Sequence, residues 1–238
     1  MIRVSKVTKH FDEVQALAEV NLDIATGEFI SIVGPSGCGK STLLRIIADL
    51  VSTKGNITKP DKGAFVFQDS ALLPWRTVQG NVELLMELEG TTQKRSKAAV
   101  ALKQVGLNGF ERSYPHQLSG GMKMRLSLAR SLVLDPEYIL LDEPLSAVDE
   151  LTREVLQEEL YGMWTRDKFT AILVTHNIAE AVYLSNRVVV MSPRPGKITD
   201  IVEISKKLGF KKRTPELRTT PQFSEVVNEI AGKLRTWK

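Results

Sequence analysis

A glycine-rich loop placed directly behind an apolar run is the feature that most limits how this chain can fold. Residues 29–33 read Phe-Ile-Ser-Ile-Val and residues 34–42 read Gly-Pro-Ser-Gly-Cys-Gly-Lys-Ser-Thr, after which a helical pattern begins at Leu43. In a strand–loop–helix unit, glycines let backbone N–H groups turn toward phosphate oxygens, and the helix N-terminus adds its dipole. The pattern predicts a loop that binds a nucleoside triphosphate; a glycine-rich turn with a chance lysine is the alternative.

Each position of this loop is a candidate nucleotide-binding residue. Lys40 has the reach to contact the β- and γ-phosphates, and the Ser41 hydroxyl is suited to ligate Mg²⁺. The backbone does most of the binding in such loops, so the single cysteine of the chain is not expected to be a catalytic thiol. The candidate set in the loop is Gly34, Pro35, Ser36, Gly37, Cys38, Gly39, Lys40, Ser41 and Thr42.

Two acidic residues, Asp142 and Glu143, follow the apolar run at 138–141. Acidic residues at the carboxyl end of a central parallel strand point into the crevice where such sheets bind ligands. We expect Asp142 to hold Mg²⁺ and Glu143 to act as general base for the attacking water. The alternative is a strand cap with solvated acids.

Strand-like and helix-like segments alternate along the chain, which favours an α/β fold with a mostly parallel sheet and helices on both faces. Residues 2–24 alternate between apolar and polar, as half-buried strands do. Further strands are expected at 64–67, 138–141, 171–174, 188–191 and 198–204. At 238 residues the chain fits a single α/β domain.

Helical periodicity covers residues 78–107 and 122–134. In the first range one apolar face is expected from Val82, Leu84, Leu85 and Leu88, and another from Ala98, Val100, Leu102 and Val105. Residues 51–63 contain Gly55, Pro60 and Gly63, and are expected to form a hairpin that leads into the strand at 64–67.

Charge is concentrated near the carboxyl terminus. Residues 205–238 contain nine lysines and arginines but three glutamates. The cluster Lys206, Lys207, Lys211, Lys212 and Arg213 could indicate a nucleic-acid or anionic-lipid partner. Aromatic residues do not alternate with these basic residues as base stacking would require. A solvated basic tail with a surface helix is therefore favoured, and no nucleic-acid partner is expected.

A second glycine pair opens the later helical pattern, in the sequence Leu118-Ser119-Gly120-Gly121. A helix N-terminus with a hydroxyl and glycines is a second anion site, although many helices begin this way. Two phosphate-binding helix starts do not obviously serve one nucleotide within a single chain. The arrangement becomes sensible if each nucleotide lies between two chains.

Taken together, these motifs resemble those of the ATP-binding subunit of an ABC transporter, over nearly the whole chain. The resemblance implies a P-loop NTPase fold in one domain, 1–238. That fold has a mostly parallel central sheet, an antiparallel β subdomain and an inserted helical subdomain at about 72–120. The landmarks, in order, are 34–42 (Walker A), Gln68 (Q-loop), 118–122 (signature), 138–144 (Walker B), 146–149 (D-loop) and His176 (switch histidine).

By this resemblance, two copies pair head to tail as a homodimer around two ATP molecules. Ser119, Gly120 and Gly121 of one copy would then face the γ-phosphate held by Lys40 of the other. Asp149 would cross the interface between the copies.

The resemblance also assigns roles around each nucleotide. His176 would hold the γ-phosphate and the water that Glu143 activates. Gln68 would touch Mg²⁺ and report its presence toward the membrane partner. Phe11 matches the position whose ring stacks on adenine; an ordinary edge-strand core residue is the alternative.

Residues 71–78, the Leu-Ser-Gly-Gly-Met signature and residues 190–196 resemble the nitrate, sulfonate and taurine importer branch. This implies an integral membrane permease and a periplasmic or extracellular substrate-binding protein as partners. The triplet Leu73-Pro74-Trp75 is a candidate lip of the groove that receives the permease, and packing within the helical subdomain is the alternative. Because 28 residues separate Lys40 from Gln68, fewer than is usual in the branch, a trimmed antiparallel subdomain is expected.

The function that follows is an ATP-hydrolysing motor subunit that energises uptake of a small solute through a separate permease. No secretion signal and no membrane-spanning apolar run is evident, so the chain is expected in the cytoplasm, peripheral on the inner face of the membrane. Three alternatives stay open: a non-transport ABC ATPase acting on nucleic acid or in cluster assembly, an exporter subunit, and a regulatory subunit without turnover.

Overall fold

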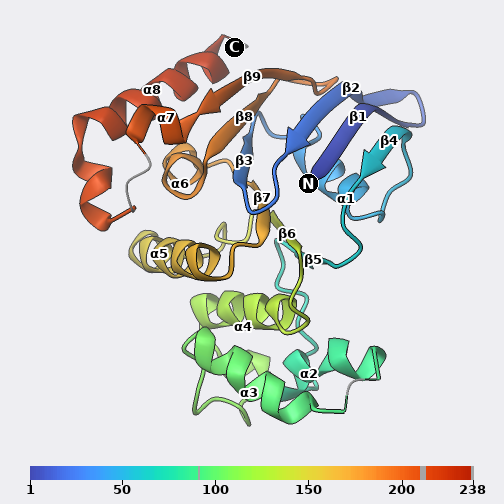
Figure 1. Cartoon of the computed structure of the whole chain (residues 1–238), viewed down its shortest axis with the longest axis vertical. Helices are drawn as coiled ribbons and strands as arrows, with labels where there is room; N and C mark the ends of the chain where they lie inside the picture. The colour runs from blue at the N-terminus through green and yellow to red at the C-terminus, as the bar shows by residue number, and fades with distance from the viewer. Residues whose placement is uncertain (91, 210–212, 237–238) are drawn as a thin grey trace.

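A six-stranded sheet carries the phosphate-binding loop (Figure 1). The computed structural model describes residues 1–90, 92–209 and 213–236. Neighbouring strands run parallel except for the last, which is antiparallel to its neighbour. The expected mostly parallel sheet is therefore confirmed. From one edge to the other, the strands are β5 (Gly63–Val66), β6 (Tyr138–Asp142), β7 (Thr170–Val174), β3 (Phe29–Val33), β8 (Arg187–Met191) and β9 (Ile198–Glu203).

The central strands are apolar on both sides because both faces of the sheet are covered. One face packs on helix α1 (Lys40–Ile47) and on a second sheet, through residues such as Ile32 and Leu140. The other face, with Phe29 and Leu141, packs on α5 (Glu150–Asp167) and α6 (Ile178–Leu184). The strands predicted at 138–141, 171–174 and 188–191 lie within this core.

The second sheet is antiparallel and has three strands in the order β2 (Val14–Ile24), β1 (Ile2–Phe11) and β4 (Lys54–Thr58). The hairpin expected over 51–63 is wrong. Strand β4 pairs with β1, Val4 opposite Ile57, whereas β5 pairs with β6 in the large sheet. Local turn residues separate the two strands correctly but do not reveal that each pairs with a strand distant in the sequence.

A group of helices lies at one end of the molecule, at the bottom of Figure 1. It consists of α2 (Val78–Leu88), α3 (Lys94–Gln104), the short helix η1 (Pro115–Gln117) and α4 (Gly120–Leu132), which contacts β5 of the large sheet. The pattern at 78–107 is thus two helices, and the one expected at 122–134 begins and ends two residues earlier. Leu88 and Val100, expected on apolar faces, are exposed, whereas Met86 and Ala101 are buried.

The basic carboxyl-terminal segment is not a solvated tail. It forms α7 (Ile204–Leu208), η2 (Pro215–Thr219) and α8 (Pro221–Arg235). Phe223, Val226 and Ile230 of α8 are buried, because their spacing of three and four places them on one helical face. Arg213 is also buried, while Lys211 and Lys212 lie outside the described residues. The surface helix expected in this segment corresponds to α8, although one face of this helix is buried.

Across the ranges that the structure describes, none of the helices has the length and apolar character needed to cross a bilayer.

Candidate functional site

The loop between β3 and α1 is folded around the ammonium group of Lys40. Its Nζ donates hydrogen bonds to the carbonyl oxygens of Gly34 (2.9 Å) and Pro35 (3.0 Å), and the residue is buried. Gly39, the N-cap of α1, has a φ of 106°, and a Cβ there would lie 2.7 Å from Leu17 Cδ2. A side chain at this position would therefore open the loop. The loop is thus shaped to present a positive charge and a helix N-terminus to phosphate.

Ser41 and Asp142 meet at the carboxyl edge of the sheet. The Ser41 hydroxyl donates to Asp142 Oδ1 at 2.7 Å, and Asp142 is buried, which raises the pKa of its carboxyl. Over the described ranges, no group of three or more His, Cys, Asp or Glu side chains is arranged to hold a metal. One hydroxyl and one carboxylate nevertheless fit Mg²⁺ in a P-loop, since phosphate and water oxygens complete its shell.

Glu143 and His176 are brought together by neighbouring strands. Asp142 of β6 pairs in register with Val174 of β7, so the residues that follow the two strands emerge side by side. Glu143 takes a positive φ of 47°, and its N–H donates to the carbonyl of Val174. Its Oε2 then lies 3.1 Å from Nδ1 of His176, whose side chain is 63% exposed. A carboxylate held by an exposed imidazole is suited to take a proton from water.

A cavity of about 540 Å³ lies in front of the loop. Phe11 is 47% exposed and stands at this cavity, so it is not an edge-strand core residue. The cavity thus has an aromatic ring and the groups of the phosphate loop, which suits a base and a phosphate chain. Its lining includes Phe11, Ser36, Gly37, Gly39, Lys40, Ser41, Thr42, Glu143 and Arg194.

Arg194 is a cavity residue that the sequence did not single out. Its guanidinium donates to the Gly37 carbonyl, from Nη2 at 3.0 Å and Nε at 3.3 Å. The turn that carries Arg194 lies directly against the loop. The approach is so close that a Cβ on Gly196 would lie 2.1 Å from the Cys38 carbonyl oxygen. The Pro-Arg-Pro-Gly sequence predicts a turn, but nothing local indicates contact with a loop 157 residues away.

The segment Ser119–Gly121, expected to form a second anion site, belongs to a different part of the chain's surface. Ser119 is exposed and caps α4, its hydroxyl accepting from the Met122 N–H at 3.3 Å. Gly120 and Gln68 line a separate cavity of about 220 Å³. Gly121 is buried, and a Cβ there would lie 3.0 Å from Thr152 Cγ2 on α5. The structure therefore brings Phe11, the loop, Asp142, Glu143 and His176 together but places the signature and Gln68 at another cavity.

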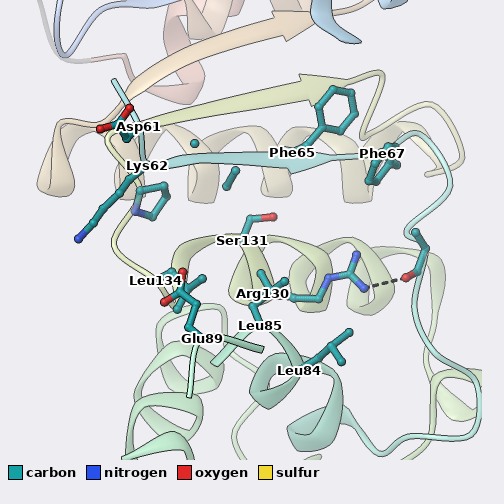
Figure 2. Close-up of a pocket in the computed structure, with 14 residues that line it drawn as sticks. Asp61, Lys62, Phe65, Phe67, Leu84, Leu85, Glu89, Arg130, Ser131 and Leu134 are labelled. Carbon is teal, nitrogen blue, oxygen red and sulfur yellow. Dashed lines mark hydrogen bonds between the residues drawn. The ribbon is translucent and has the colours of Figure 1, made fainter. Parts of the chain in front are cut away.

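A third hollow, of about 490 Å³, lies between β5, α2 and α4 (Figure 2). Phe65 of β5 and Phe67, just after it, line the hollow at the strand, and Leu84 and Leu85 line it from α2. Arg130 of α4 closes one side and donates to the Ala71 carbonyl at 2.7 Å. This contact fixes the segment after Gln68 to α4.

The apolar triplet that follows is only partly exposed. Trp75 is 72% exposed and Pro74 is exposed, but Leu73 is half-buried. The backbone of Leu73 is tied to the side chain of Asn81, as donor at 2.8 Å and acceptor at 3.1 Å.

Comparison with known proteins identifies the family. A family model described as ABC transporter matches residues 17–146. The chain is 44% identical to the uncharacterized ABC transporter ATP-binding protein MJ0412 of Methanocaldococcus jannaschii, over 98% of this chain and 91% of that protein. It is 41% identical to the aliphatic sulfonates import ATP-binding protein SsuB of Bacillus cereus, over 96% of this chain and 94% of that protein.

The fold has solved relatives. The dimeric structure of MJ0796, a bacterial ABC transporter cassette, has a TM-score of 0.76 and 33% identity, covering 86% of this chain and 99% of that one. A post-hydrolysis state of the same cassette, bound to ADP and Pi, gives a TM-score of 0.75. The chain therefore belongs to the ABC transporter family, as an ATP-binding subunit with the P-loop ABC ATPase fold.

Proposed function

We propose that this chain is the ATP-hydrolysing motor of an importer for a small solute of the nitrate, sulfonate or taurine kind. The observation that carries the proposal is the pairing of Glu143 with His176 beside Lys40 and the Ser41–Asp142 contact. A subunit that only binds ATP has no need for a carboxylate held by an exposed imidazole. The likeness to the sulfonate importer subunit supports the choice of substrate class.

Each group at the site has a distinct task in hydrolysis. Lys40 binds the β- and γ-phosphates and neutralises part of their charge. Ser41 and Asp142 would hold Mg²⁺, which would supply positive charge to offset the negative charge that develops on the phosphate oxygens. Glu143 accepts the proton of the attacking water, and His176 keeps that carboxylate oriented. General base catalysis of this kind supplies about 10²–10⁴ in rate.

Binding of the base is assigned to Phe11. The ring of Phe11 is exposed at the cavity. Nζ of Lys9, also on β1, lies 4.9 Å from the centroid of this ring. We also infer that Gln68 reports bound Mg²⁺, and the hydrogen bonds that tie the segment after it to α4 through Arg130 support this role.

The working unit is a homodimer with ATP between the two copies. Within one chain, Gly120 lines a cavity other than that of the phosphate loop, so a nucleotide on Lys40 does not have the signature beside it. A head-to-tail partner would supply Ser119, Gly120 and Gly121. Dimeric cassettes of the same fold support this arrangement.

The chain is assigned to the cytoplasm, on the inner face of the membrane, through a permease that docks near the hollow of Figure 2. The hollow lies beside the segment after Gln68, and exposed Trp75 follows in the same segment. A protein that docks here contacts both the sheet and the α2–α4 helices. Movement between these two parts would then be passed to the permease.

The test is reconstitution of the chain with its permease in liposomes, together with the substrate-binding protein. ATP hydrolysis should rise when the binding protein and a sulfonate or nitrate are added on the side of the membrane opposite the nucleotide. Labelled substrate should then accumulate in the compartment that holds the nucleotide, and only when ATP is present. Hydrolysis that is indifferent to permease and binding protein would contradict the importer assignment.

A further inference from the structure

A cavity of about 420 Å³ lies at the opposite end of the sheet from the nucleotide site. Asn186 lines it, and the Asn186 N–H donates to the carbonyl of Phe29, the first residue of β3. The phosphate loop follows the other end of that strand, roughly 16 Å away for five residues. Its walls come from the ends of α5 and α6, from Ser205 of α7, and from Gly209 and Arg213.

Two residues that line this cavity carry buried donors without hydrogen-bond partners among the described residues. Arg213 is 7% exposed, and its Nη1 has no hydrogen-bond partner among the residues that the structure describes. Its Nη2 lies 3.5 Å from the Ser185 carbonyl oxygen, a weak contact. Trp164 is also 7% exposed, and its Nε1–H is likewise unpartnered within the described ranges. Buried polar groups are nearly always hydrogen-bonded, so two such donors at one cavity need an acceptor.

The charge at the cavity is positive and uncompensated. Burial lowers the pKa of Arg213, and the nearby groups that raise it are the phenols of Tyr161 and Tyr183 rather than a carboxylate. Lys168 also lines the cavity, with its Nζ 4.7 Å from the centroid of the Trp164 ring. None of the described lining residues is acidic. A water molecule could satisfy the N–H groups, but it would leave the buried cation without a counter-charge.

We propose that this cavity binds a small oxyanion of the sulfate, phosphate or sulfonate type. The guanidinium of Arg213 supplies the counter-charge, and the Trp164 indole supplies a further donor. The cavity is larger than an inorganic oxyanion and has apolar walls at Tyr161 and Leu184. It therefore also has room for an oxyanion that carries a short organic group. This site is separate from the nucleotide site and does not depend on the proposed transport function.

The experiment uses the full chain with its nucleotide site saturated by ADP and Mg²⁺, so that the phosphate loop cannot bind the probe. Sulfate, phosphate and ethanesulfonate are titrated at constant ionic strength, and thermal unfolding and heats of binding are measured. At least one should bind saturably and raise Tm by roughly 5–10 °C at a hundred times its Kd. The three probes distinguish an inorganic anion from an organic sulfonate.

Arg213→Met removes the charge but keeps an apolar stem. We expect its affinity for the bound anion to fall at least tenfold, its ATPase rate to match wild type, and its Tm without anion to equal or exceed wild type. A purely structural arginine would instead lower Tm when replaced. Arg166→Met, which removes an exposed charge from the same α5 region, is the matched control and should bind the anion normally.

Trp164→Phe gives a second variant in case Arg213→Met does not fold. It keeps the ring that packs edge-on against Phe29, at 5.8 Å between centroids, and removes the unpartnered N–H. Its anion affinity should fall severalfold. The proposal is overturned if no probe binds saturably with the nucleotide site filled, or if both variants bind as tightly as wild type.

Discussion

The carboxylate of Glu143 lies 3.1 Å from the imidazole of His176, although 33 residues separate them in the chain. The contact exists because β6 and β7 are neighbours in register and each carries its functional residue just past its carboxyl end. Sheet topology therefore brings together the two residues that we propose for hydrolysis, and no loop has to reach across the site.

Glu143→Gln should retain ATP but hydrolyse it at least a hundredfold more slowly, because the amide cannot take a proton from water. ATP-bound dimers should accumulate and be visible by size-exclusion chromatography with ATP and Mg²⁺. Glu225→Gln, an exposed position on α8, is the control and should turn over normally. A wild-type rate in Glu143→Gln would refute the general-base role.

Glu180 gives a prediction for pH. This buried carboxylate accepts a hydrogen bond from the Thr175 hydroxyl, and burial raises its pKa to about 7. The folded protein then keeps a proton that the unfolded chain releases above about pH 4.3. Protonated Glu180 makes its full contribution to the free energy of unfolding below about pH 4.3. As the pH rises from there toward 7, roughly 3 kcal/mol of that free energy is lost. Arg153 and His176 oppose this shift, and Glu143 adds to it.

Glu180→Gln removes this titration while keeping the shape of the side chain. The free energy of unfolding of the variant, minus that of wild type, should increase as the pH is raised from 5 to 7.5. Denaturant unfolding of both proteins across that range measures the difference. A wild-type-minus-variant difference that does not change with pH would show that Glu180 is ionised throughout.

Much of this site could be predicted from the sequence. The phosphate loop, Asp142, Glu143 and His176 each stand at the end of a continuous apolar strand, and that pattern is local. Arg194 and the pairing of β4 with β1 could not be predicted, because they depend on contacts between segments far apart in the chain. The burial of Arg213 could not be predicted either, because its basic neighbours in the sequence favoured a solvated segment.

Phe11→Ala should raise the KM for ATP roughly tenfold with little change in kcat, since base–aromatic stacking is worth about 1–3 kcal/mol. Phe11→Trp, which keeps an aromatic face, should restore binding. Phe110→Ala removes another exposed ring, in the segment after α3, and serves as the control. Steady-state kinetics of the four proteins decide the point. An unchanged KM in Phe11→Ala would remove this residue from the nucleotide site.

Mixing two inactive variants tests whether the nucleotide lies between two chains. Lys40→Ala disables the phosphate loop, and Ser119→Arg blocks the exposed signature while losing a helix cap worth about 1 kcal/mol. In a head-to-tail heterodimer, one site combines both damaged halves and the other combines both intact halves. The mixture should therefore hydrolyse ATP faster than either variant alone, whereas mixing Lys40→Ala with Glu143→Gln should give no recovery, because both changes disable the same half-site. If the Lys40→Ala and Ser119→Arg mixture stays as inactive as its components while both remain folded, each chain completes its own site, and the signature acts in cis.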